Sequence, residues 1–383
     1  MKVLHLFSNA RWTGPAEPAL NLCVALRRLG VDADFACPPE APAGTHTMLE
    51  TARDRGIEPI LRFRLTKHAR LLANAADRAA LSRYLRERPY DLVHCHLDND
   101  HRIALGPAAR RGVPIIRSSY SGTGFRRRPR YARMLAGTAW LIEPSDAAAA
   151  HDADSFAFAR ERMTVIPGAV DVERFDPARE VPDARRWLGI PPDAFVVGIV
   201  ARMQTHRHYE DFFRAIRTLA DRRGEIHAIV VGRGTNQERV GKQPVRELGL
   251  ADRVHFPGYV AGENYVGMVK AFDAKVFLVP GSDGTCRAVR EAMAMAKPAV
   301  VARRGMLPEI VDDGATGFVV DGGPESLVEA IERLAADRAL ARSMGHAARA
   351  KAVESFSLAA QARAVRAVYE SVLAAHPDPA AAS

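Results

Sequence analysis

The sequence of 383 residues has few cysteines, few lysines and no long apolar run. Its four cysteines are Cys23, Cys37, Cys95 and Cys286. They are too few and too scattered for a disulfide scaffold or a Cys-x-x-Cys metal site, so we expect free thiols and no metal. No segment approaches the roughly 20 apolar residues that cross a bilayer, and the apolar start is too short for the core of a signal peptide. The sequence predicts a cytoplasmic protein, or one that lies peripherally on the cytoplasmic membrane face.

Basic charge is plentiful but unevenly distributed. Residues 62–133 contain 17 Lys and Arg against 5 Asp and Glu, a balance of +12, whereas the whole chain carries +9. Such a concentration indicates one basic face, whose candidate partners are an anionic membrane surface, a phosphorylated acceptor or a nucleic acid. Solvated surface charge is the alternative. Because the sequence contains no nucleic-acid-binding motif, we expect no nucleic-acid partner.

Two segments of this basic stretch, Leu61–Arg88 and Gly124–Leu135, also carry apolar side chains. The second contains Phe125 and Tyr131 together with Arg126, Arg127, Arg128 and Arg130. Basic residues interleaved with aromatic ones suit a membrane interface, where each basic residue near an anionic surface contributes about 1 kcal/mol. We therefore predict that the four arginines form a basic patch, which contacts a membrane or an anionic acceptor.

Short apolar runs alternate with helical patterns in both halves of the chain. The strand-like runs of the first half are Val3–Phe7, Asp32–Cys37, Asp91–His94 and Val113–Ile116. This alternation is typical of a parallel sheet with helices on both faces, the doubly wound α/β class. The stretch Asp176–Asp193 is rich in proline and charge and separates the halves. We expect two domains, 1–185 and 186–383, with the last helix of a helical C-terminal tail packing back on the first domain.

The segment Pro280–Val320 carries the clearest chemistry. It passes from a buried strand through a Gly/Ser turn into a helix that we expect to begin at Thr285–Cys286. A helix start offers free backbone N–H groups and a positive dipole end, which suit a diphosphate. Asp283 and Glu291 flank this start, and their carboxylates suit neutral hydroxyls of a sugar and a ribose. A simple helix-capping role is the alternative for Asp283.

Several motifs resemble those of the retaining, nucleotide-sugar-dependent glycosyltransferases of family 4. The family pattern E-G-F-G-x-x-x-x-E-A-M-A-x-G-x-P-V corresponds here to D-G-T-C-R-A-V-R-E-A-M-A-M-A-K-P-A-V. The following G-G-x-x-E-I-V-x-D-G-x-T-G corresponds to R-G-M-L-P-E-I-V-D-D-G-A-T-G. Ile166–Pro177 is similar to the family's I-P-N-G-V-D-x-x-R-F-x-P. The resemblance implies the GT-B fold, in which two Rossmann-like doubly wound domains face each other across a cleft.

The resemblance implies three catalytic residues in the second half. Asp283 takes the place of the glutamate that contacts the donor sugar. Arg202 and Arg207 correspond to the cationic pair that clamps the diphosphate, with Arg207 in place of a lysine. Such a pair stabilises the charge that develops on the leaving group, and arginine keeps that charge while adding a bidentate fork. The pair takes the role that a metal ion has in other transferases, so we expect metal-independent transfer.

The resemblance also implies a set of donor-binding residues. Glu291 matches the glutamate that holds the nucleotide ribose. Backbone amides near Thr285, Cys286 and Arg287 match those that touch the sugar and the diphosphate. Gly14, from the weaker match in the first half, takes the place where the backbone approaches the donor.

On the acceptor side, His96 matches a histidine at a strand end, and Tyr120 stands where the family commonly has a histidine. A purely structural role is an equal alternative for His96. Three residues depart from the family pattern: Tyr120 replaces a His, Asp283 replaces a Glu and Pro15 replaces a Gly. All three positions lie around the sugar and acceptor, whereas the nucleotide-binding positions match the family. The identity of the sugar and acceptor is therefore the open part of the prediction.

We predict a retaining glycosyltransferase that moves a sugar from a UDP- or GDP-sugar to a cell-envelope or lipid-linked glycan acceptor such as lipopolysaccharide, with no cofactor. The alternatives are a sugar-nucleotide epimerase or phosphorylase of the same fold, and a catalytically weak partner subunit that binds a nucleotide sugar.

Overall fold

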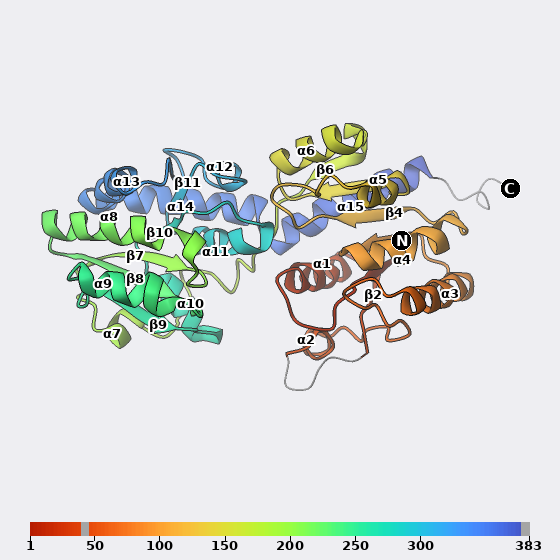
Figure 1. The fold of residues 1–383 in the computed structure, drawn as a ribbon, viewed down its shortest axis with the longest axis horizontal. Helices are drawn as coiled ribbons and strands as arrows, with labels where there is room; N and C mark the ends of the chain where they lie inside the picture. Colours follow the sequence, from red (N-terminus) through yellow and green to blue (C-terminus); the bar gives the residue numbers. More distant parts are fainter. Residues whose placement is uncertain (40–45, 377–383) are drawn as a thin grey trace. The chain divides into compact units, whose positions relative to one another are not determined.

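The computed structural model describes residues 1–39 and 46–376, and within them it leaves the side chains of Asp283 and Thr285 undescribed. The chain divides into two compact units. Unit 1 comprises residues 1–168 together with the chain from Leu358 onward, and unit 2 comprises Ala169–Ser357. Each unit is built on one six-stranded sheet (Figure 1).

The sheet of unit 1 is parallel throughout, with the strand order β2-β1-β3-β4-β5-β6. Its strands are β1 (Lys2–Leu6), β2 (Asp32–Ala36), β3 (Leu92–Cys95), β4 (Ile115–Ser118), β5 (Trp140–Glu143) and β6 (Met163–Val165). The helices of this unit are α1 (Ala16–Arg28), α2 (Met48–Asp54), α3 (Leu71–Glu87), α4 (Asp98–Ala109), α5 (Pro129–Ala136), α6 (Asp146–Phe156) and α15 (Leu358–Ala375), with one short 3₁₀ turn, η1 (Arg160–Arg162). Every residue of β3 and β4 is buried, as expected for a parallel sheet that helices cover on both faces.

The sheet of unit 2 is also parallel, with the order β12-β11-β10-β7-β8-β9. Its strands are β7 (Phe195–Val200), β8 (Ile226–Val231), β9 (Val254–Gly258), β10 (Ala274–Phe277), β11 (Ala299–Ala302) and β12 (Gly317–Val320). Its helices are α7 (Ala184–Leu188), α8 (Tyr209–Arg222), α9 (Gln243–Glu247), α10 (Gly262–Ala271), α11 (Asp283–Ala294), α12 (Leu307–Ile310), α13 (Pro324–Ala336) and α14 (Arg338–Ser355), with the short helical turns η2 (Thr205–Arg207) and η3 (Glu238–Lys242). Successive side chains of β7 enter different cores, since Val196 packs in one hydrophobic cluster and Phe195 in the other.

The division between the units falls at Gly168–Ala169, earlier than the expected boundary at residue 185. The proline-rich and charged stretch that suggested a linker is packed in unit 2, because Ala184 and Ile190 are buried in one of its hydrophobic cores. Helix α15 belongs to unit 1, where Val365 and Tyr369 pack in the same core as residues of α1. The boundary therefore lies before the stretch that composition suggested, and α15 is grouped with unit 1.

The strands of unit 1 also differ in detail from the expected runs. β4 occupies Ile115–Ser118 and not Val113–Ile116, because Pro114 has no N–H for the ladder and the strand continues through the polar Arg117. β5 and β6 are short strands that the apolar runs do not indicate.

Candidate active site

In unit 2, the order of the strands identifies where a ligand would bind. The chain order reverses between the neighbouring strands β7 and β10, and ligands of open α/β sheets bind beyond the carboxyl ends of the strands at such a switch point. Arg202 follows the end of β7, and α11 follows the end of β10. The switch point therefore brings together the two segments that the motifs assign to the diphosphate.

Two glycines fix the loop that carries Arg202. A Cβ atom at Gly232 would lie 2.2 Å from the carbonyl oxygen of Ala201, and one at Gly234 would lie 2.3 Å from that of Met203. Gly232 also has φ +137°, which side chains rarely allow. The loops after β7 and β8 thus pack backbone against backbone, which holds the Arg202 segment at the sheet edge.

The two arginines of the proposed clamp are available for a ligand. Arg202 is exposed, and Arg207 lies half-buried on the turn η2. Among the residues whose side chains the structure describes, neither guanidinium forms an ion pair, and the buried Nε of Arg207 has no hydrogen-bond partner. A buried N–H without an acceptor is costly, so an anion at this position would stabilise Arg207.

Helix α11 begins at Asp283, earlier than the expected start at Thr285–Cys286. The amide of Cys286 donates to the carbonyl oxygen of Ser282, 3.0 Å away, and the Cys286 side chain is fully buried. The Cys286 amide is therefore used within the helix, and donor binding by the amides near Thr285, Cys286 and Arg287 stays a prediction. By helix geometry, the amides of residues 283–285 are the ones without an intrahelical acceptor.

Glu291 lies two turns into α11 and is only 6% exposed. One of its carboxylate oxygens accepts a hydrogen bond from the hydroxyl of Tyr265, and the other lies 3.2 Å from Nε of Arg287. Burial is the main cause that raises the pKa of Tyr265, and the charge of Glu291 raises it further. The phenol therefore stays protonated and donates the hydrogen bond. Glu291 is consequently held in a fixed position by Tyr265, and Arg287 contacts it directly.

In unit 1, a cavity of about 380 Å³ opens at the carboxyl ends of β3 and β4. His96 and Tyr120, the two predicted acceptor-side residues, both line it, and Pro15 lines it from the start of α1. Gly14 precedes that helix in an exposed position where an added Cβ would meet nothing within 4 Å. The structure thus brings the three first-half candidates to one edge of the sheet.

His96 is fully buried and Tyr120 is half-buried. Nδ1 of His96 lies 2.7 Å from the Tyr120 hydroxyl. Burial and the neighbouring His94 hold the pKa of His96 well below its usual range, so the imidazole is neutral.

Arg117 and Asp98 also line this cavity, although neither is among the residues that the motifs single out. Arg117, on β4, is 4% exposed, and its Nη2 donates to Asp98 Oδ1 at 3.1 Å. The hydroxyl of Tyr131 donates to Asp98 Oδ2 at 2.6 Å. The one signal in the sequence is an arginine within an apolar strand, which requires a buried partner.

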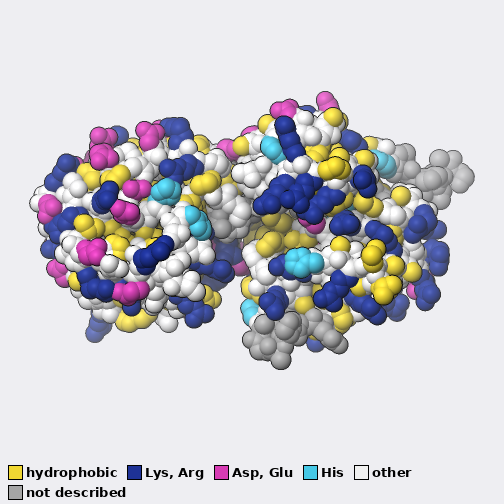
Figure 2. All heavy atoms as spheres, in the orientation of Figure 1, with side chains coloured by type: hydrophobic (Ala, Val, Ile, Leu, Met, Phe, Trp, Pro, Cys, Tyr) yellow, Lys and Arg dark blue, Asp and Glu magenta, His cyan; other side chains and the backbone are white. Residues whose placement is uncertain are grey.

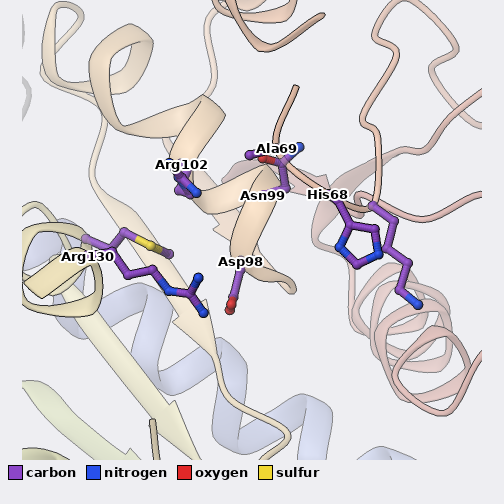
Figure 3. A pocket seen from close by; sticks show the side chains of 8 residues that line it. His68, Ala69, Asp98, Asn99, Arg102 and Arg130 are labelled. Atoms are coloured by element: carbon purple, nitrogen blue, oxygen red, sulfur yellow. The ribbon is translucent and has the colours of Figure 1, made fainter. Parts of the chain in front are cut away.

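A smaller cavity of about 150 Å³ adjoins the same residues, with Asp98 and Arg130 lining both cavities. Figure 3 shows Asp98 from α4 and Arg130 from α5 approaching each other, with His68 on the far side of Asp98. Carboxylate and guanidinium groups therefore meet at this edge of unit 1, where they can bind a hydroxyl and an anionic group together.

The predicted basic patch is exposed at all four arginines, but its aromatic partners are not. Phe125 and Tyr131 are each 8% exposed and pack against one another at 5.1 Å between ring centroids. The expectation that they reach a membrane is wrong, because they form a core cluster of unit 1. Among the described residues, the most exposed large apolar side chains are instead Leu71 and Leu72 at the start of α3. Lys and Arg side chains gather on the face of unit 1 in the space-filling view (Figure 2).

Comparison with known proteins decides the family. Residues 13–174 match the family described as Glycosyltransferase Family 4, and residues 180–351 match Glycosyl transferases group 1. The chain is 30% identical over 247 residues to the lipopolysaccharide core biosynthesis mannosyltransferase LpsB of Rhizobium meliloti, covering 62% of this chain and 69% of that protein. The chain belongs to the family 4 glycosyltransferases.

Other members of the family are similar over a larger part of this glycosyltransferase. The D-inositol 3-phosphate glycosyltransferase of Streptomyces avermitilis is 29% identical over 311 residues, which is 75% of this chain and 66% of that protein. The chain thus spans about two thirds of the length of these relatives. The crystal structure of HepE from Anabaena in complex with UDP superimposes with a TM-score of 0.78 at 20% identity, covering 97% of this chain and all of that one. This likeness confirms the GT-B fold. Among the described residues of this glycosyltransferase, no helix is long and apolar enough to cross a membrane.

Proposed function

We propose that this family 4 glycosyltransferase moves a sugar from a UDP- or GDP-sugar to an acceptor hydroxyl with retention of the anomeric configuration. The observation that carries the proposal is the switch point of unit 2, where Arg202, Arg207 and the start of α11 come together. These groups supply two cationic side chains and a helix N-terminus, which suit a diphosphate. Glu291, which is buried in α11, takes the ribose hydroxyls.

Catalysis in this proposal is electrostatic. As the bond between the sugar and the diphosphate breaks, negative charge grows on the leaving phosphate, and the fixed positive charges of Arg202 and Arg207 stabilise it. The departing phosphate oxygen takes the proton of the acceptor hydroxyl as the new glycosidic bond forms on the same face. Asp283 contacts the donor sugar, and no dedicated enzymatic base is required.

We assign the acceptor to the cavity of unit 1. Asp98 accepts hydrogen bonds from hydroxyls, while Arg126 and Arg130 line the same cavity with positive charge. An acceptor with both hydroxyls and an anionic group fits this combination. Two relatives, a D-inositol 3-phosphate glycosyltransferase and a mannosyltransferase of lipopolysaccharide core biosynthesis, support a polyol phosphate or an envelope glycan as the acceptor.

A lipid-linked acceptor would place the enzyme at an anionic membrane surface. Leu71 and Leu72 are 93% and 85% exposed, and Lys67 and Arg70 stand beside them in the sequence. An exposed apolar pair flanked by basic residues is typical of a peripheral contact, in which leucine enters the interface and the cations meet lipid headgroups.

The experiment is turnover of UDP- and GDP-sugars with and without a lipid extract. We expect the nucleoside diphosphate to be released only when the extract is present, and the product to keep the anomeric configuration of the donor. Conversion of the donor sugar without any acceptor would indicate an epimerase. Binding of the nucleotide without turnover under every condition would indicate a partner subunit.

A further inference from the structure

Three loops lie side by side at the carboxyl edge of the sheet of unit 2, because β7, β10 and β11 are neighbours in that sheet. The loop after β7 contains the turn η2, which carries Arg207. The loop after β10 leads into α11, and the loop after β11 contains Arg304. A side chain of one loop can therefore tie the others together.

Arg304 makes two such ties with one nitrogen. Its Nη1 lies 2.8 Å from Nε2 of His208, and it donates to the carbonyl oxygen of Leu278, 3.2 Å away. Leu278 follows the last residue of β10, and His208 stands between η2 and α8. Arg304 thus joins the segment that carries Arg207 to the end of β10.

The backbone of His208 is unusual for the residue before a helix. Such residues generally have an extended backbone and a side chain that caps the helix. His208 has φ +56° and ψ 36°, the left-handed region that residues other than glycine rarely adopt, and its side chain makes no capping hydrogen bond. A strained conformation of this kind persists only where the surrounding structure fixes it, and such conformations cluster at functional sites.

The contacts of the imidazole show what fixes His208. Its Nε2 faces Arg304, and its Nδ1 lies 3.2 Å from a carboxylate oxygen of Asp211, which belongs to the first turn of α8. A guanidinium has N–H donors and no acceptor, so Nε2 of His208 must accept. The ring therefore carries its proton on Nδ1 and donates it to Asp211. We call Arg304, His208 and Asp211 the clip.

The clip acts on Arg207 because His208 is the next residue in the chain. Rotation of the His208 backbone out of the left-handed region would redirect η2 and the arginine that it carries. A second tie holds the same segment, since the hydroxyl of Tyr209 donates to the carbonyl oxygen of Ala201, 3.2 Å away. The buried Nε of Arg207, which has no hydrogen-bond partner among the described residues, is thus held in place with its N–H open to a ligand.

We propose that Arg304 and His208 are positioning residues, which hold η2 so that Arg207 faces the switch point before an anion binds there. A fixed cation stabilises an anion better than one that must first be brought into place. That the anion is the diphosphate of the donor rests on the proposed function, whereas the clip itself does not depend on it. The alternative is that Arg304 contacts the diphosphate directly.

The first test is nitrogen NMR of the intact, ligand-free protein labelled with ¹⁵N-histidine at pH 8. Two-bond correlations show which ring nitrogen carries the proton, and the variant His208→Gly assigns the signal. We expect the proton of His208 on Nδ1. A proton on Nε2 would overturn the proposal, because Nε2 could then not accept from Arg304.

The second test is amide hydrogen exchange of residues 203–209 in Arg304→Met and in His208→Gly, again without ligand. Glycine adopts the left-handed conformation without strain, so His208→Gly keeps the fold while it removes both bonds of the ring. We expect exchange at least about fivefold faster than in the wild type, the effect of one lost hydrogen bond. The matched control is Arg303→Met, which removes the neighbouring exposed arginine of the same loop and should leave the exchange unchanged. Unchanged exchange in both clip variants would overturn the proposal.

The third test is calorimetric titration of UDP and GDP, and of uridine and guanosine, into the same variants. We expect Arg304→Met and His208→Gly to bind the diphosphate about three- to tenfold more weakly and the nucleoside unchanged, with Arg303→Met like the wild type. In the background of Arg207→Ala, neither change should weaken binding further, because the clip acts through Arg207.

An equal loss with and without Arg207 would show that Arg304 contacts the diphosphate itself, and it would overturn the positioning role. If the wild type binds neither diphosphate, the proposed function is contradicted. The tautomer of His208 and the exchange of η2 still decide the clip in that case.

Discussion

Replacement of Arg117 with Met should destabilise unit 1 in a pH-dependent way. The guanidinium is almost fully buried and lies 3.1 Å from Asp98 and 3.8 Å from Asp100. Burial raises the pKa of Asp100 to about 7, and Arg117 is the first group that opposes this shift. The ordinary pKa of an aspartate is 3.8, so between pH 3.8 and about 7 the carboxyl of Asp100 is protonated in the folded protein and ionised in the unfolded chain. Folding therefore takes up a proton in this pH range, and the free energy of unfolding falls as the pH rises through it.

The magnitude follows from which carboxylate is buried. Asp98 keeps 45% of its side chain exposed, so its bond to Arg117 is screened and contributes little. Asp100 is fully buried, and removal of one partner of a buried pair costs about 3–5 kcal/mol. Asp100 is ionised only above its pKa, so we expect Arg117→Met to lower the free energy of unfolding by about 3 kcal/mol at pH 8 and by clearly less at pH 5.

The assay is urea unfolding of the wild type and the variant at both pH values. The matched control is Arg62→Met, since Arg62 is 63% exposed and its ion pair with Glu87 spans 3.7 Å. We expect this control to change stability by about 0.5 kcal/mol or less at either pH. An equal loss at pH 5 and pH 8 for Arg117→Met would refute the assignment of Asp100 as its titrating partner.

Three further outcomes are expected. Asp283→Asn should keep the nucleotide affinity and the melting temperature, but its rate of sugar transfer should fall at least about tenfold because a charged hydrogen bond to the sugar is lost. Full activity, measured by diphosphate release, would indicate that Asp283 only caps the helix. Replacement of Arg126, Arg127 and Arg128 by Ser together should weaken binding to anionic vesicles at low salt. Wild-type binding should fall as salt rises, because the Debye length shrinks from about 30 Å at 0.01 M to about 8 Å at 0.15 M. Equal sedimentation with neutral and anionic vesicles would exclude the membrane contact. Transfer should persist in excess EDTA within about twofold, since arginines replace a metal at the diphosphate, and a complete loss that Mg²⁺ restores would show that a metal takes part.

The doubly wound sheets and the segments at the switch point of unit 2 were predictable from the sequence, because strand–helix alternation and the motif around Glu291 are local patterns. In the cavity of unit 1, the sequence indicated His96 and Tyr120, together with Pro15 and the patch arginines Arg126 and Arg130. Arg117 and Asp98 are separated along the chain and become partners only through the register of β3 and β4, which no local pattern encodes.

The division between the units shows the same limit. Composition marked Asp176–Asp193 as a linker, yet two of its apolar residues, Ala184 and Ile190, are buried in unit 2. Burial of single side chains outweighed the proline and charge content of the stretch. The start of α11 also differed, because the amide of Cys286 donates to the carbonyl oxygen of Ser282 and the helix therefore begins at Asp283, two residues before Thr285.

The central claim is that a diphosphate binds at the switch point of unit 2. The most direct test is calorimetric titration of nucleoside diphosphates, and of the matching nucleosides, into the wild type and Arg207→Ala. We expect Arg207→Ala to bind the diphosphate about 10–150-fold more weakly, the value of one charge-assisted contact, and to bind the nucleoside unchanged. Arg214→Ala, which removes an exposed arginine of α8 paired with Glu210, should bind both ligands as the wild type does. Equal diphosphate affinity in Arg207→Ala and the wild type would contradict the assignment of this site to the nucleotide sugar.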